Sequence, residues 1–485
     1  MKTAQLNSTA RLSWPQRFCY GLGQGGGGII YTLGTTFLLV YYTNVVHIDP
    51  AVSASIIAVS KLLDGLSDLL MGYIVDRTNS RFGKARPWLL RFVLPAMVCM
   101  FATFSVPAGL AGTAQIVYVF VSYNLLTTVC FTAVTVSYNS LNSLITTDQY
   151  ERGINNVLGM TFNTVAMLAL NMVMLKLCTF FGGGELYSGK GWSVTVGILC
   201  LIYGVCIMVT FLFCKEMEVG DKGARTEPEV KKAKLKTVRI IGMLVTNKYW
   251  VEYVLALVSV TICSGIVMGS ALFYAQYVLD DVYSYPTLST ALYLSMFVGV
   301  IITSVFIKKI GKRNTAIIGC IILIVGTVAV GILPASVNNT LLTMILRGLG
   351  VGFPSAIGNA MLQDSLTYGK WKTGVHIVGM GNAASSFVQK LSSGLSVAVI
   401  GWVLSLGGFD SNQAVQSAGA QGAITALFVW IPLIFVVAAL LCFIAYRLDK
   451  EYAGYIADMN EGKYGPKAIV VPDETDGAEA KLSDQ

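Results

Sequence analysis

The sequence has little charge. Only 12% of its 485 residues are Asp, Glu, Lys or Arg, whereas 54% are hydrophobic, and this balance excludes a soluble globular protein of this size. Its polar segments are too short for a soluble catalytic domain. No nucleophile–base pairing and no metal-ligand spacing stands out. We therefore expect a protein that is not an enzyme and that has no cofactor.

Other common signals are also missing. The first 17 residues are polar, and the apolar run after them is too long for the core of a signal peptide, so we expect no cleaved leader. The ten cysteines lie almost all in apolar runs without a Cys-x-x-Cys pair, which indicates packing residues rather than disulfides or metal ligands.

Long apolar runs are abundant instead. A helix crosses a bilayer with about 20 mostly apolar residues, and twelve such runs recur. The sequence therefore predicts an all-α membrane protein of twelve transmembrane helices in two six-helix halves. The expected spans are 18–45, 51–76, 88–108, 115–145, 154–180, 192–214, 249–279, 286–307, 314–333, 340–365, 374–405 and 420–446.

Charge sets the expected orientation. Most of the 34 lysines and arginines fall in the tails and in alternate loops, with the largest share in one middle segment. The positive-inside rule then places both termini and that segment in the cytoplasm, so the net charge of +8 needs no nucleic-acid partner. The expected parts are an N-terminal bundle (1–214), a cytoplasmic middle loop (215–248), a C-terminal bundle (249–446) and a cytoplasmic tail (447–485).

The two halves carry corresponding loops. DRTNSRFGKARP (76–87) follows the second span and IKKIGKRN (307–314) follows the eighth, and each pairs a glycine turn with clustered cations. Such correspondence is typical of transporters built from duplicated six-helix halves. We expect these loops to form gates by pairing with acids or carbonyls at helix ends.

Three charges interrupt the second span, KLLDGLSDLL (61–70). A charge at the bilayer centre costs at least roughly 2.5–3.5 kcal/mol, so Lys61, Asp64 and Asp68 must face protein or trapped water. Two acids one helical turn apart repel, and either a cation bridges them or one keeps a proton. Ser67 offers a further oxygen ligand. The alternative is a purely structural ion pair between Lys61 and one acid.

Polar stripes follow two other spans. The stripe in the fourth span indicates either a wetted wall or hydrogen bonds between packed helices; it consists of Thr128, Thr132, Thr135, Asn139 and Asn142. The stripe in the eleventh span includes a second deep cation, Lys390, which could neutralise an acid or hold an anionic substrate group; it consists of Asn382, Ser386, Gln389, Lys390 and Ser393. Arg347 is expected near an interface, with no assigned role.

These motifs resemble a known family. KLLDGLSDLLMGYIVDRTNSRFGKARPWLL (61–90), TTDQYERG (146–153), FLFCKE (211–216) and QDSLTYGKWKTG…SSFVQKLSSGL (363–374, 385–395) are similar to signatures of the glycoside–pentoside–hexuronide:cation symporters, the melibiose-carrier family. The similarity spans essentially the whole chain. It implies a major-facilitator fold that imports sugars or sugar derivatives with Na⁺, H⁺ or Li⁺.

The resemblance assigns roles residue by residue. Asp64 and Asp68 look like the cation-binding acids, joined by Thr132 and, from the spacing, by Ser67; Na⁺, if it is the coupling ion, is expected at Asp64, Asp68 and Thr132. Lys390 and Lys61 are the expected coupling residues. The expected substrate-binding residues are Gln24, Thr128, Thr135, Asn139, Asn382 and Gln389.

Three positions depart from the family pattern. Gln24 replaces a usual Asp, Thr135 replaces the sugar-binding Asp of the melibiose carrier, and Gly159 or Met160 replaces their Arg partner. This loss argues against melibiose-like galactoside recognition. A carboxylated or sulfonated substrate would be tolerated better without those acids, and neutral glycosides stay open.

The expected function is secondary active import of a sugar, glycoside or sugar acid by alternating access. Its expected partners are that substrate, a coupling cation and the lipid bilayer of a bacterial inner membrane. Two alternatives are a lysolipid or amphiphile symporter of the same architecture and a non-transporting membrane sensor.

Overall fold

The computed structural model describes residues 12–146, 149–216, 237–375, 377–411, 413, 415–461, 463 and 465. Within these residues the regular structure is entirely helical. Nine described helical segments are long and apolar enough to cross a membrane, and each coincides with an expected span. The other three expected spans coincide with helical segments that fall outside this set, 14–45, 50–77 and 86–103, so the count of twelve stays a prediction.

The N-terminal half begins with one long helical segment that contains two π-helical turns. Its other helices lie where the long apolar runs predict them, and the fourth expected span also contains a π-helical turn. The elements are α1 (Trp14–Thr32), η1 (Leu33–Phe37), α2 (Leu38–Val40), η2 (Tyr41–Val45), α3 (Pro50–Arg77), α4 (Arg86–Thr103), α5 (Thr113–Asn124), η3 (Leu125–Phe131), α6 (Thr132–Ile145), α7 (Gln149–Phe181) and α8 (Gly189–Phe213).

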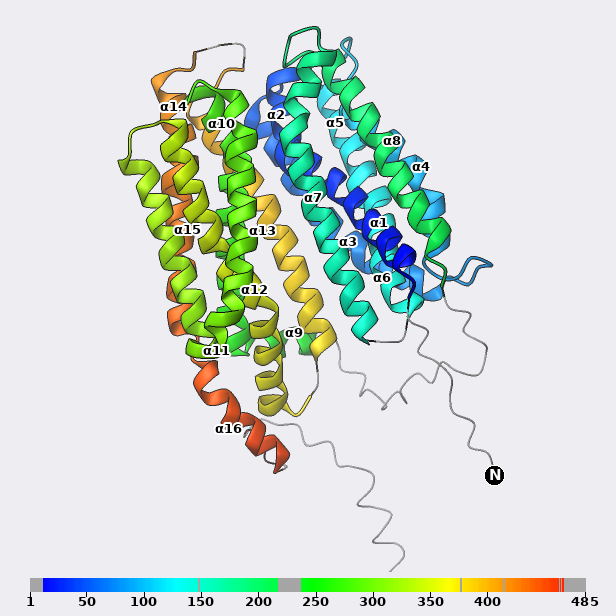
Figure 1. The fold of residues 1–485 in the computed structure, drawn as a ribbon, viewed down its shortest axis with the longest axis vertical. Coiled ribbons are helices and arrows are strands. Elements are labelled where there is room, and N and C mark those ends of the chain that lie inside the picture. Colours follow the sequence, from blue (N-terminus) through cyan, green and yellow to red (C-terminus); the bar gives the residue numbers. More distant parts are fainter. Residues whose placement is uncertain are drawn as a thin grey trace, which may run out of the picture.

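The C-terminal half forms a second bundle beside the first (Figure 1). Its elements are α9 (Thr237–Val245), α10 (Lys248–Tyr277), η4 (Val282–Ser284), α11 (Tyr285–Ile332), α12 (Val337–Thr373), α13 (Val378–Leu406), α14 (Ala418–Thr425), η5 (Ala426–Trp430), α15 (Ile431–Ala445) and α16 (Leu448–Asn460).

Local signals explain where the key helices begin and end. Asp49 caps α3, because its Oδ1 accepts hydrogen bonds from the backbone N–H groups of Ala51 (2.8 Å) and Val52 (3.2 Å), and Pro50 occupies the first turn. Gly374 ends α12 in the left-handed conformation, with φ of 73°.

The structure adds three details to the expected parts. The expected spans 286–307 and 314–333 are joined within α11 by a turn at Gly311, whose φ of 82° lies in the left-handed region. The middle loop contains α9, and the expected tail contains α16, which packs on α11 and α12. Hydropathy misses α9 and α16 because neither is long enough to span the bilayer.

Arg347 was also misplaced by the sequence. It is fully buried in the C-terminal half, where Nη2 donates to the Phe428 carbonyl at 2.8 Å and the guanidinium lies over the Phe428 ring. The carbonyl belongs to η5, a π-helical turn, and such turns leave backbone groups available for side chains. Arg347 therefore ties α12 to η5.

The two halves meet most closely at the end of the molecule opposite α16, hereafter the opposite end (Figure 1). There the Tyr285 hydroxyl of α11 donates to Asn171 Oδ1 of α7 at 2.7 Å, with both side chains buried. Asn44 Nδ2 donates to the Tyr277 hydroxyl at 3.1 Å. The structure is therefore closed at the opposite end.

Candidate functional site

The acids of α3 lie against η3 and α6 in matching register. Thr128 Oγ1 donates to Asp64 Oδ1 at 2.7 Å, and Thr132 Oγ1 lies 3.1 Å from Asp68 Oδ1. The two acids lie one helical turn apart on α3, and the two threonines lie one turn apart on the fourth span. Because the two helices run parallel, each threonine meets the acid at its own level. The fourth span thus supplies one hydroxyl to each carboxylate.

Ser67 joins the same cluster. Its hydroxyl donates to the Asp64 backbone carbonyl at 3.0 Å and lies 3.2 Å from Thr132 Oγ1. Thr132 can also donate to the Thr127 carbonyl at 3.1 Å, since the π-helical turn η3 presents that group five residues back. The Thr132 proton therefore has two acceptors, and its oxygen can turn toward a ligand.

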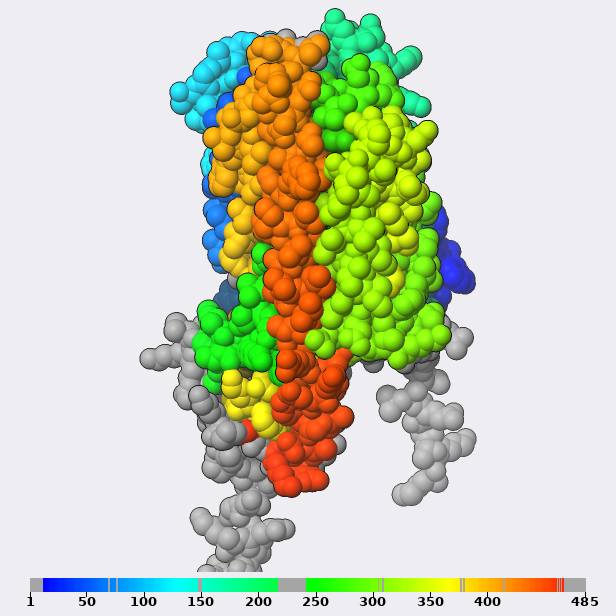
Figure 2. All heavy atoms as spheres, turned by 90° about the vertical axis from the view of Figure 1, so that its left-hand side faces the viewer, coloured from blue at the N-terminus to red at the C-terminus, as the bar shows by residue number. Residues whose placement is uncertain are grey.

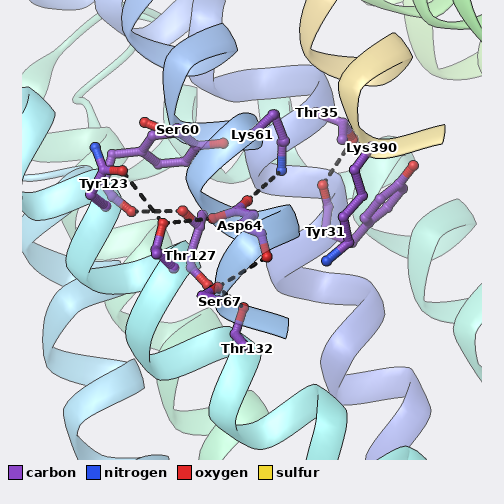
Figure 3. Close-up of polar contacts among 12 residues, drawn as sticks. Tyr31, Thr35, Ser60, Lys61, Asp64, Ser67, Tyr123, Thr127, Thr132 and Lys390 are labelled. Atoms are coloured by element: carbon purple, nitrogen blue, oxygen red, sulfur yellow. Dashed lines mark hydrogen bonds and ion pairs between the residues drawn. The ribbon is translucent and has the colours of Figure 1, made fainter. Parts of the chain in front are cut away.

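A lysine approaches each acid. Lys61 Nζ lies 3.5 Å from Asp64 Oδ2 within α3 (Figure 3), and Lys390 of α13 forms an ion pair with Asp68 Oδ2. Asp64 is buried and Lys61 is mostly so, whereas about a third of the Lys390 and Asp68 side chains is exposed. Lys390 reaches across from the other half, so its pair with Asp68 links the two bundles.

Small residues permit this crossing. A Cβ added at Gly394 of α13 would lie 2.8 Å from Lys61 Cβ, and one added at Gly65 of α3 would lie 2.7 Å from the Phe387 ring. Both distances are shorter than van der Waals contact, so the helices approach as closely as they do because these positions are glycine. The approach brings Lys390 within reach of Asp68.

The charges of the cluster determine what it can bind. Asp64, Asp68 and Lys61 sum to a net charge of −1, which the Lys390 ammonium cancels. The carboxylates and the hydroxyls of Thr128, Thr132 and Ser67 are oxygen ligands, the type that hard cations prefer. A single monovalent cation or a proton could therefore replace Lys390 without leaving net charge in the membrane.

The expected substrate residues are dispersed. Thr128 belongs with the acids, as its bond to Asp64 shows. Asn382 Oδ1 accepts a hydrogen bond from Gln363 of α12 at 2.9 Å. Gln24 lies beside Gly159, with its backbone carbonyl accepting from Asn163 Nδ2 at 3.3 Å. The other three are half-buried or exposed, and they form no side-chain hydrogen bond with the described residues: Thr135, Asn139 and Gln389.

The glycine loops bind helix ends within their own halves. In the N-terminal half, Glu216 accepts from the backbone N–H groups of Lys84 (2.8 Å), Ala85 (2.8 Å) and Arg86 (2.9 Å) at the start of α4. The Arg86 guanidinium donates to the Phe211 carbonyl at the end of α8, at 2.6 Å from Nη2. Together these contacts form a carboxylate clamp.

The C-terminal half repeats the clamp. Asp449 of α16 accepts from the Arg313 backbone N–H at 2.7 Å, and Arg313 Nε donates to the Phe443 carbonyl at the end of α15 at 3.1 Å. The turns also match, because Gly83 (φ 101°) and Gly311 (φ 82°) both adopt the left-handed region. The expected helix-end partners are thus present, and they tie each loop to its own half.

Sequence reasoning missed the contacts that close the opposite end. Besides Tyr285 and Asn171, the two halves are joined there by Trp402 Nε1, which donates to Ser55 Oγ at 3.0 Å, and by the hydroxyls of Thr179 and Tyr283, 3.1 Å apart. No local pattern marks these residues, because each is an ordinary polar side chain until the halves are placed together.

Relatives named as transporters or carriers match nearly the full chain. The chain is 28% identical over 468 residues to an isoprimeverose transporter of Lactiplantibacillus pentosus. The aligned region covers 95% of this chain and 94% of the relative. It is 25% identical to a glucuronide carrier protein homolog of Escherichia coli. That aligned region covers 93% of this chain and 97% of the homolog.

The fold is shared with solved transporters. A crystal structure of a D-xylose-proton symporter superposes with a TM-score of 0.61 at 13% identity, covering 89% of this chain and 95% of the other. The family model described as MFS/sugar transport protein matches residues 19–450. The chain therefore belongs to the MFS/sugar transport protein family.

Proposed function

We propose that the chain is a symporter that uses a monovalent cation to import a sugar, glycoside or sugar acid by alternating access. The observation that carries this proposal is the pair of acids on α3, each held by a hydroxyl from the fourth span and one of them paired with a lysine of the other half. Because the family is one of transporters, the chain is a carrier and not an enzyme.

The cation acts by replacing Lys390. In the described conformation Asp68 is paired with Lys390 across the halves, and a cation that binds Asp68 must displace this lysine. Cation binding at Asp64, Asp68, Thr128 and Thr132 releases the lysine and so alters a contact between the two bundles. A cation that changes an inter-half contact has the differential affinity for two conformations that coupling requires.

Substrate binds between the halves, next to the released lysine. Lys390 is partly exposed, Gln389 next to it in α13 is exposed, and Asn382 lies two turns nearer the start of that helix. The relatives named as isoprimeverose transporter and glucuronide carrier homolog support a saccharide rather than a lysolipid, and they include neutral and acidic types by name. The substrate thus contacts the C-terminal half through hydrogen-bonding amides and one ammonium.

Orientation follows from the positive-inside rule. If the lysine-rich and arginine-rich loops lie on the cytoplasmic side of a bacterial inner membrane, α16 and both termini are cytoplasmic. The opposite end is then external, and the described conformation is inward-facing.

The function is tested by uptake in vesicles that contain the purified chain. Labelled neutral glycosides and uronates are supplied with an inward Na⁺ gradient, with an inward proton gradient, or with neither. We expect one saccharide class to accumulate above its external concentration under one gradient. Equilibration of every saccharide under every gradient would contradict the proposal.

A further inference from the structure

The short helix α9 has an apolar face that is exposed among the described residues. Ile241 is 50% exposed and Val245 is 61% exposed, and their spacing of four residues places them on one side of the helix. Leu244, on another side, is fully buried against α10 and α12. The helix is therefore apolar on both its packed and its outward sides.

The orientation of α9 is fixed by its junction with α10. Asn247 is buried, its Nδ2 donates to the Ser365 carbonyl at 2.7 Å, and its Oδ1 caps α10 by accepting from the Trp250 N–H at 3.1 Å. Lys372 Nζ donates to the Thr246 carbonyl at 2.7 Å. These bonds hold α9 crosswise to α10 at the end of the C-terminal half (Figure 1).

The level of α9 matches the edge of the membrane-spanning region. The span α10 begins at Lys248, three residues after α9 ends. Aromatic side chains, which favour the interface between lipid and water, gather at the same level, where the Tyr249 and Tyr368 rings lie 4.8 Å apart. In the space-filling view, this segment projects sideways at the base of the bundle (Figure 2).

Cations surround the same end of the helix. Lys248 is 64% exposed, and Lys370 and Lys372 occupy the last turn of α12 beside it. Glu252 lies 3.8 Å from Lys248 and offsets one of these charges. An apolar face flanked by lysines suits binding to anionic lipids. The apolar side chains pack at the boundary of the acyl chains, and the ammonium groups pair with the phosphates.

We propose that α9 lies in the lipid–water interface and binds the anionic phospholipid headgroups of the leaflet at the α16 end. Ile241 and Val245 enter the acyl boundary, while Lys248 and Lys370 pair with phosphate. Because Asn247 and Lys372 fix α9 to α10 and α12, this contact anchors the C-terminal half to one leaflet. The N-terminal half then moves relative to an anchored partner.

Hydrogen–deuterium exchange of the full-length chain in nanodiscs tests this proposal. The amides of residues 241–247 are compared in discs of phosphatidylethanolamine with phosphatidylglycerol and in discs where phosphatidylcholine replaces the anionic lipid. We expect exchange to be roughly tenfold slower with the anionic lipid. Equal exchange in both discs would overturn the proposal.

Variants separate the apolar and the ionic parts. The double variant I241S/V245S should exchange equally fast in both discs, and the double variant K248Q/K370Q should lose most of the dependence on phosphatidylglycerol. Leu406→Ser changes an exposed apolar residue at the opposite end and should leave residues 241–247 unchanged. Slow exchange that survives I241S/V245S would contradict the proposed contact. None of these outcomes depends on transport.

Discussion

Lys390 of α13 and Asp68 of α3 form an ion pair that joins the two halves of the carrier. The pair depends on the close approach of α3 and α13 at Gly65 and Gly394. It also completes a neutral set of two acids and two lysines inside the membrane. Occupation of the acids and the relative position of the halves are therefore physically linked.

Replacement of Lys390 by Met should separate cation binding from net transport. Without the competing ammonium, cation affinity should rise about tenfold, which corresponds to ~1.4 kcal/mol. The empty carrier would have to reorient with Asp68 unpaired, so net uptake should fall far more than substrate exchange. Isothermal titration and paired uptake and exchange assays measure both effects. Lys176→Met, at an exposed site on α7, is the control; unchanged cation affinity in Lys390→Met would contradict the competition.

Thr132→Val should weaken cation binding because it removes an oxygen ligand while it keeps the side-chain shape. Hydrogen bonds to charged groups contribute about 1.5–3 kcal/mol, so we expect at least a tenfold loss of affinity. Thr132→Ser should retain most of the affinity. Thr127→Val is the control, because it makes the same substitution in the same span. The Thr127 hydroxyl donates to the Tyr123 carbonyl and not to an acid. Equal losses in Thr127→Val and Thr132→Val would show that the effect is structural.

Gly394→Ala should disturb the contact between the halves. Its Cβ would lie 2.8 Å from Lys61 Cβ and 3.2 Å from the Ala58 carbonyl oxygen, and such overpacking costs about 1–3 kcal/mol. Thermal unfolding in detergent should show a lower midpoint, and coupled uptake should fall. Gly72→Ala on α3 meets no atom within 4 Å and should be neutral or slightly stabilising. A Gly394→Ala variant as stable and active as Gly72→Ala would rule out the close approach.

Glu216→Gln should loosen the N-terminal clamp. The carboxylate accepts from three backbone N–H groups at the start of α4, and an amide accepts them more weakly because it carries no charge. Hydrogen exchange at residues 84–86 should rise roughly tenfold. Asp449→Asn should have the corresponding effect at Arg313 in the other half. If neither variant changes exchange at its loop, the clamps do not hold these turns.

The sequence predicts the helices and the acids, but not their partners across the halves. Asp64, Asp68 and Lys61 are visible because charges in an apolar run are rare, and Thr132 is visible through its stripe and the family motif. Tyr285 and Asn171 are not visible, because nothing in a single sequence states which helices of the two bundles touch. Arg347 was misplaced because a π-helical turn on another helix provides its partner.

The most direct test of the account is the accumulation ratio of the Asp68→Asn carrier in vesicles under an imposed inward cation gradient. We predict that the wild-type chain concentrates its saccharide above the external level, whereas Asp68→Asn only equilibrates it, since the amide leaves the cation without its second carboxylate. An Asp68→Asn carrier that concentrates substrate as far as the wild type would contradict the role of the acidic pair.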